Sequence, residues 1–161
     1  MSHNIGDVYG GGKIFYISPD GLTGLIVAPE NQSTGIQWYN GINIITGAID
    51  TAIGTGQANT AKIIDAQGVG SYAAQLCNDL ILGRYNDWFL PSKDEIHELY
   101  LQMHIIGIPP DSYWSSVEKM RLQHIIKNFV MVDGIFLGRG RVQQLMYELF
   151  VKQHLIKEDK I

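Results

Sequence analysis

Cysteine is nearly missing from this sequence of 161 residues, since Cys77 is the only one. A single cysteine excludes an intramolecular disulfide, a CxxC zinc site and two-cysteine redox chemistry. Long hydrophobic runs are missing as well: no stretch approaches about 18 apolar residues, and no apolar segment follows a basic start. We therefore expect neither membrane insertion nor a signal peptide, and a fold that is stabilised by packing.

Charge is also scarce. Charged residues make up 17% of the chain, the net charge is −4, and the twelve Lys and Arg residues form no dense basic stretch. The electrostatic pattern of a nucleic-acid-binding protein is therefore missing, and we expect no nucleic-acid partner. Hydrophobic residues at 45% and 18 glycines predict one turn-rich globular domain over residues 1–161.

The usual motifs of catalysis and metal binding are missing too. The sequence contains no G-x-S-x-G, H-E-x-x-H, EF-hand or P-loop pattern. The glycines at 54 and 56 match only part of a dinucleotide fingerprint, so we interpret them as a glycine loop entering a helix. His97 and His104 are two helical turns apart, which favours solvated or core histidines over a chelating pair. We predict no catalytic residue, no metal site and no cofactor, and an inert buried Cys77.

The first half of the chain contains two apolar runs that predict a β-hairpin. KIFYI at 13–17 and GLIVA at 24–28 flank the turn signal Pro19-Asp20-Gly21. Both runs are too apolar for exposed strands, so at least one face must be covered. From 29 to 56 the sequence is rich in Asn, Gly, Thr and Ser, which predicts a long loop of the kind that often binds ligands.

Three helices are expected next. QANTAKIIDAQG predicts a helix over 57–68, and SYAAQLCNDLILG predicts a second over 71–83 between Ser71 and Gly83. The stretch NDWFLPSKDEIHEL then combines Pro91 with an S-x-x-E capping box of Ser92 and Glu95. Its dense charges favour a structural helix start over an active site. The buried stripe of this helix is expected at Ile96, Leu99, Tyr100 and Met103.

The remainder of the chain is expected to return to strands, at 112–116 and in a hairpin of 124–132 and 135–138. The tail favours a helix by its spacing, although LFV at 149–151 alone also fits a short strand. The helical spacing is carried by Val142, Leu145, Met146, Leu149 and Phe150. Trp38, Trp88 and Trp114 are interpreted as core or loop-anchoring rings rather than sugar-stacking platforms.

Several motifs together resemble a known family. They are GDVYGGGKIFYI, GLIVAPENQSTGIQWYNG, IGTGQANTAKIIDAQG, YAAQLCNDL, YNDWFLPSKDEIHELY and YWSSVE. In this order they resemble the C-terminal domain of the collagen-like adhesin of Legionella, over residues 6–118. The resemblance implies an α+β, C-type-lectin-like fold, related to formylglycine-generating enzymes. It has two main helices packed on a twisted antiparallel sheet with long loops.

The same resemblance implies a function. Family members lie at the tips of adhesins and phage fibres, often as trimers. We therefore expect a non-catalytic module of a phage virion or surface adhesin, made in the cytoplasm and displayed on the virion or cell surface. It would recognise a glycan or protein receptor, as a homotrimer, together with other virion proteins. Pro29-Glu30-Asn31 and Asn86-Asp87-Trp88 hold the letters of calcium-lectin motifs in the wrong order, so no calcium site is assigned.

Two alternatives stay open. The chain fits a purely structural virion subunit that trimerises through its apolar tail, and a superfold enzyme that does without the reactive cysteine pair. The segment 119–161 diverges from the family, and its basic hairpin is predicted to form the ligand face. The candidate ligand-binding residues are Lys119, Arg121, Lys127, Asn128, Arg139 and Arg141.

Overall fold

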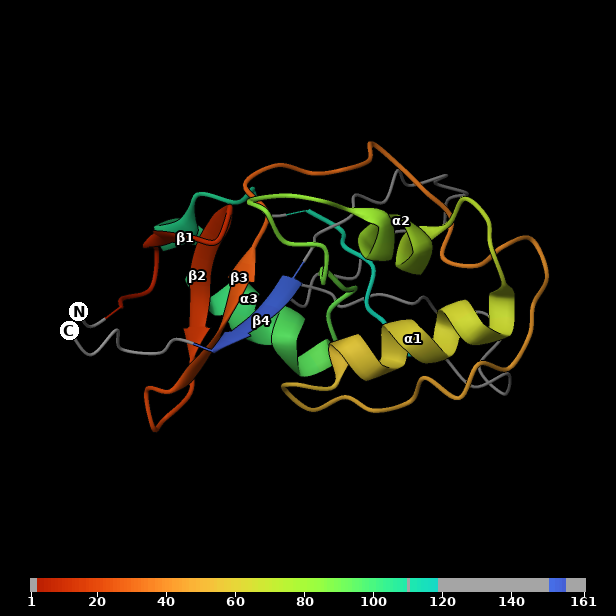
Figure 1. The fold of residues 1–161 in the computed structure, drawn as a ribbon, viewed down its shortest axis with the longest axis horizontal. Helices are drawn as coiled ribbons and strands as arrows, with labels where there is room; N and C mark the ends of the chain where they lie inside the picture. The colour runs from red at the N-terminus through yellow and green to blue at the C-terminus, as the bar shows by residue number, and fades with distance from the viewer. Residues whose placement is uncertain (1–2, 110, 119–150, 156–161) are drawn as a thin grey trace, which may run out of the picture.

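The computed structural model describes residues 3–109 and 111–118, together with the backbone of one strand at 151–155. The described chain is α+β, as the sequence predicts, and its sheet is antiparallel. Figure 1 shows the order of the elements. They are β1 (Val8–Tyr9), β2 (Gly12–Ile17), β3 (Thr23–Val27), α1 (Gly56–Gln67), α2 (Ala73–Asp79), α3 (Lys93–Ile106) and β4 (Val151–Leu155).

The sheet has the order β1-β2-β3-β4, with every neighbouring pair antiparallel. The predicted hairpin is confirmed as β2 and β3, where Lys13 pairs with Val27 and Ile17 with Gly24. The turn between them is closed by the Ser18 amide, which donates to the carbonyl of Thr23 at 2.8 Å. The short strand β1 was not predicted, because two residues carry no readable alternation.

The tail of the chain differs from its prediction. Helical spacing favoured a helix, but residues 151–155 form β4, and this prediction is wrong for them. Val151 pairs with Val27 and Leu155 with Thr23, so β4 gives β3 a partner on its second edge. The short strand that LFV also allowed is therefore the outcome at Val151, where the backbone of β4 pairs along the whole of β3. Residues 142–150 and the predicted hairpin at 124–138 lie outside the described residues.

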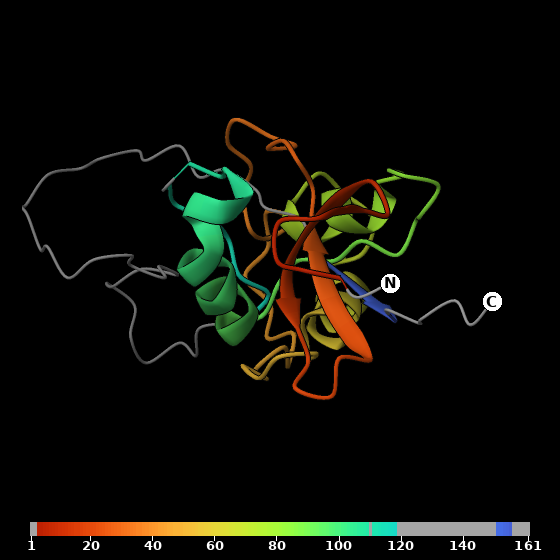
Figure 2. The same cartoon turned by 90° about the vertical axis from the view of Figure 1, so that its left-hand side faces the viewer.

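The strands are apolar because both faces of the sheet are covered. Along β2, Ile14 belongs to a core cluster with α1 and α2, whereas the next residue, Phe15, belongs to a cluster with α3. On β3, Ile26 faces the first cluster, and Leu25 and Val27 face the second. Figure 2 shows α3 on one side of the strands and the other two helices on the opposite side. Two buried faces explain why simple polar alternation is missing.

The stretch before α3 contributes to both clusters at once. Trp88 and Leu90 are buried with α1 and α2, and Phe89 between them is buried with α3. An extended chain points successive side chains to opposite sides, which is how three neighbours reach two cores. Trp88 and Pro91, which lie just before α3, are both buried.

Two helices agree with their predictions in most respects, and one does not. The predicted helix over 57–68 is confirmed as α1, and Gly68, which ends it, has a positive φ of 70°. The helix α3 ends at Gly107, which adopts the left-handed conformation. Within α3, Ile96, Leu99 and Met103 are buried as predicted.

The second helix is shorter than the predicted 71–83, because it runs from Ala73 to Asp79 only. Tyr72 is extended, and the amide of Ala73 donates to the carbonyl of Gln37 rather than within a longer helix. At the other end Leu80 is extended, and Leu82 forms an isolated bridge with Tyr85.

The predicted strand at 112–116 is also wrong, since only Tyr113 makes a single bridge. The hydrogen bonds of this segment go to loops instead of a ladder. The amide of Ser116 donates to the carbonyl of Pro91 at 2.7 Å, and the amide of Ser112 donates to Asp111 Oδ1. Among the described residues, no helix is long and apolar enough to cross a membrane.

We predict that Gly12→Ala destabilises the fold by about 2 kcal/mol, the usual cost of overpacking a filled core. A Cβ at Gly12 would overlap the carbonyl oxygen of Val27 and lie 3.3 Å from the Trp88 ring. Urea unfolding measures the loss. Val8→Ala, at an exposed position of the neighbouring strand, is the control and should change stability by less than about 0.5 kcal/mol. Equal stabilities of the two variants would contradict this packing.

Candidate functional site

The charged stretch NDWFLPSKDEIHEL contains the start of a helix, as the sequence predicts. Asp87, Asp94 and His97 are exposed, whereas Glu95 is fully buried. The predicted capping box is confirmed: the Ser92 side chain accepts from the Glu95 amide, and the Glu95 side chain accepts from the Ser92 amide at 2.6 Å. The densely charged residues of this stretch therefore surround the start of α3.

The carboxylate of Glu95 does more than cap its own helix. Its Oε1 also accepts hydrogen bonds from the amide of Gly54 at 2.7 Å and the amide of Gly56 at 3.4 Å. Gly56 is the first residue of α1, so one buried carboxylate lies at the N-terminal ends of both long helices. Negative charge is favourable at such ends, where backbone amides lack helical partners.

Burial raises the pKa of Glu95, and the hydrogen bonds from Ser92, Gly54 and Gly56 oppose this effect in part. The raised pKa means that the folded state binds this proton more strongly than the unfolded state does.

Two of the three tryptophans anchor the long loop, in agreement with their prediction as core or loop-anchoring rings. Trp38 Nε1 donates to the carbonyl of Ser115 at 2.8 Å, and Trp114 Nε1 donates to the carbonyl of Ile36 at 2.7 Å. Each ring therefore donates a hydrogen bond to the segment that carries the other ring, and the two bonds join the same pair of segments. Trp88 Nε1 donates to the carbonyl of Leu82 at 3.3 Å.

Beyond Trp38, the loop is clamped by Asn40 at the end of α1. The backbone amide of Asn40 donates to Oε1 of Gln67 at 3.1 Å. The side-chain Nδ2 of Asn40 donates to the backbone carbonyls of Gln67 and Val69, each at 3.2 Å. A Cβ at Gly70 would overlap this side chain, so the turn after α1 needs a glycine here. Asn40 thus ties the loop to the turn between α1 and α2.

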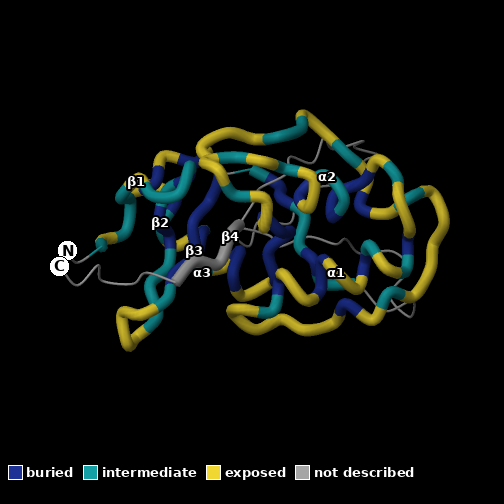
Figure 3. The backbone as a smooth tube through the Cα atoms, in the orientation of Figure 1, coloured by how far each residue is buried: buried dark blue, intermediate teal, exposed yellow. Residues whose placement is uncertain are grey.

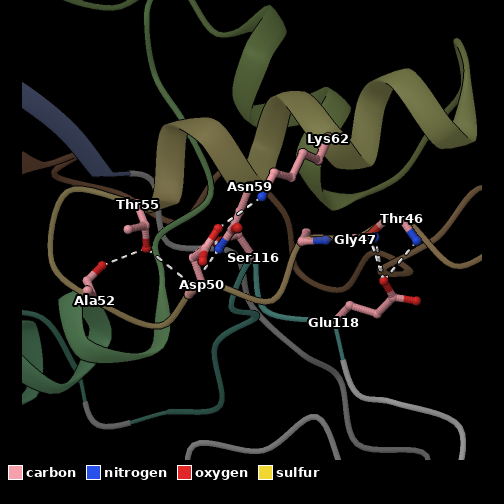
Figure 4. A network of polar contacts seen from close by, with 10 residues as sticks. Thr46, Gly47, Asp50, Ala52, Thr55, Asn59, Lys62, Ser116 and Glu118 are labelled. Carbon is pink, nitrogen blue, oxygen red and sulfur yellow. Dashed lines mark hydrogen bonds and ion pairs between the residues drawn. The ribbon is translucent and has the colours of Figure 1, made fainter.

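A second clamp follows a few residues later and is drawn in Figure 4. Glu118 Oε2 accepts from the amide of Thr46 at 2.8 Å, from its Oγ1 at 2.9 Å and from the amide of Gly47 at 3.0 Å. The Glu118 amide donates to the carbonyl of Ala48 at 2.6 Å. This loop segment is therefore bonded to the residue that directly precedes the divergent part of the sequence.

The rest of the loop is held against α1 and α3. Asn59 Nδ2 donates to the carbonyl of Asp50 at 2.6 Å, and Lys62 forms an ion pair with the Asp50 carboxylate at 2.9 Å (Figure 4). The carbonyl of Thr51 accepts from the amide of Asp94 at 3.0 Å. The long loop predicted over 29–56 is thus ordered by contacts with both helices.

Between the two clamps lies a short segment with little cover, residues 41–45, which we call the loop tip. All five of its residues are exposed, and the exposed fraction is 66% for Ile42 and 80% for Ile45. Tyr39 and Ile49, on either side, are exposed as well. Figure 3 shows the loop as a mostly exposed segment that wraps around α1. Apolar side chains that remain exposed on a clamped loop are typical of a contact surface.

The described residues contain no group of three or more His, Cys, Asp or Glu side chains that is able to hold a metal ion. Cys77 is buried, as predicted. The candidate ligand-binding residues lie outside the described residues, so their role stays a prediction. They are Lys119, Arg121, Lys127, Asn128, Arg139 and Arg141. Sequence reasoning did not predict either clamp. Asn40, Thr46 and Glu118 belong to no motif that indicates a hydrogen-bond partner far along the chain.

A scan of the chain against protein-family models finds no match, and a search of the curated proteins finds none.

We predict that Glu95→Gln removes a pH dependence of stability. Because the pKa of Glu95 is raised on folding, its protonation stabilises the folded state fully below the ordinary glutamate pKa. This contribution is lost as pH rises through the raised pKa. Urea unfolding of both proteins between about pH 4 and about pH 8 should show the wild type losing stability relative to the variant in this window. The opposite slope would mean that the amide donors outweigh burial.

We predict that Glu118→Ala releases the second clamp and destabilises the fold by about 2 kcal/mol, since it leaves three donors without their acceptor. Amide hydrogen exchange should become faster at Thr46 and Gly47. Glu30→Ala removes an exposed carboxylate at the other end of the loop and serves as the control. Unchanged exchange in Glu118→Ala would show that the loop holds its conformation without this carboxylate.

Proposed function

We propose that the protein is a non-catalytic binding module with a C-type-lectin-like fold, which recognises a surface ligand as part of a phage virion or an adhesin. The observation that carries this proposal is the loop tip, which is exposed and apolar although the loop on both sides of it is clamped. An ordered loop presents its side chains in one arrangement, which lowers the entropic cost of binding.

Two further features support a lectin-like module. Helices cover both faces of an antiparallel sheet, and the longest irregular segment, between β3 and α1, wraps around the outside of the fold (Figure 1). Binding residues often lie on such loops, which a rigid scaffold positions. The resemblance of the sequence to the adhesin domain family is carried by the motifs within residues 6–118.

The position of Glu118 connects the two regions that are predicted to bind. Glu118 is bonded to the loop beside its tip, and the next residue, Lys119, is the first of the candidate ligand-binding residues. The basic side chains that follow are suited to acidic sugars or phosphates. The clamp therefore matters for the binding function as well as for stability.

We expect the wild-type protein to be retained on a glycan array or on whole bacterial cells, with and without added calcium. Glu118→Ala should weaken this retention roughly tenfold, about 1.4 kcal/mol of binding free energy, because the loop loses its fixed arrangement. Glu30→Ala should bind like the wild type. If no glycan and no cell-surface preparation retains the wild-type protein, the proposed function is wrong.

A further inference from the structure

The loop tip contains aliphatic side chains and almost no polar ones. Its aliphatic residues are Ile42, Ile44 and Ile45, and its single polar side chain is that of Asn43. The most exposed apolar residue of the described chain, Val69 at 92%, is next to the tip, because its carbonyl accepts from Asn40 Nδ2. An exposed apolar residue of the turn after α1 therefore lies beside the N-terminal end of the loop tip.

Charge is missing from this surface as well. The sequence from Asn31 to Ile49 contains no Asp, Glu, Lys or Arg. Asp50, the next acidic residue, is paired with Lys62 at 2.9 Å. An acidic sugar or a phosphate would find no basic side chain within the loop tip, and a ligand that contacts the tip must be uncharged where it does so.

The polar groups at both ends of the tip are already used inside the protein. The side chain of Asn40 donates to two carbonyls, and the hydroxyl of Thr46 donates to Glu118. A neutral glycan is recognised through hydrogen bonds to its hydroxyls and through flat aromatic rings. The isoleucines of the tip offer neither, and the exposed ring of Tyr39 lies beside the tip rather than within it. Desolvating sugar hydroxyls against them costs free energy without compensation.

The core of a protein–protein interface has the opposite character, since it is apolar and depleted of charge. We propose, on the basis of the binding function above, that the partner of the loop tip is an uncharged, apolar surface of another protein rather than a glycan. Ile42, Ile44 and Ile45 enter this surface, with Val69 beside them. The clamps at Asn40 and Thr46 keep the isoleucines in place before the partner arrives.

The test uses the full-length protein and a displayed library of random peptides as the probe. Selection on the wild type should enrich uncharged peptides with apolar side chains, and Ile45→Lys should weaken their binding at least about tenfold. Val8→Lys is a matched control, because Val8 is 78% exposed and Ile45 is 80% exposed. This control should bind the same peptides with unchanged affinity.

Other occupants of the tip give other results, and each would overturn the inference. Peptides that bind Ile45→Lys as well as the wild type bind elsewhere. A dimer in light scattering that only Ile45→Lys abolishes would make the occupant a second copy of this chain. A loss of more than about 1 kcal/mol of stability in Ile45→Lys, absent from Val8→Lys, would mean that the chain covers its own isoleucines.

The inference and the proposed function fail separately. If a glycan is retained by the wild type and lost in Ile45→Lys, the tip binds sugar: the inference is overturned, and the proposed function stands. If enriched peptides need Ile45 but no glycan or cell-surface preparation retains the protein, the inference stands and the proposed surface function is wrong.

Discussion

The carboxylate of Glu95 is the point on which the arrangement of the described chain depends. It accepts hydrogen bonds from backbone amides at the start of α3 and at the start of α1. These two helices cover opposite faces of the sheet. Gly56 must lack a side chain for the carboxylate to fit, since a Cβ there would overlap Glu95 and the Phe89 ring. A glutamate that the sequence identifies as a helix cap therefore joins the two layers, and the end of the long loop is bonded to it through Gly54.

The long loop illustrates how order and exposure combine. Its backbone is held by a few side chains from distant parts of the chain, among them Trp114, Gln67 and Glu118. None of these contacts buries the isoleucines of the loop tip. Hydrogen bonds thus define the shape of this loop while hydrophobic burial does not, which leaves apolar area available for association.

Features with local causes were predictable from the sequence. The capping box at Ser92, the hairpin turn and the glycine that ends α1 each depend on residues within one turn of chain. The start of α2, the conformation of 112–116 and the clamp at Glu118 were not, because they depend on hydrogen bonds between residues far apart in the sequence, such as Ala73 with Gln37 and Ser116 with Pro91. The same holds for β4, where pairing with β3 outweighs a helical pattern.

The pairing of β3 with β4 also has a consequence for how the chain folds. β3 ends at Val27 and its partner begins at Val151, so the sheet joins an early and a late part of the chain. During synthesis, β2 and β3 emerge long before β4, and the apolar outer edge of β3 has no strand to pair with. Such non-local pairing slows folding and leaves the edge of β3 open to wrong partners until β4 has been synthesised and pairs with it.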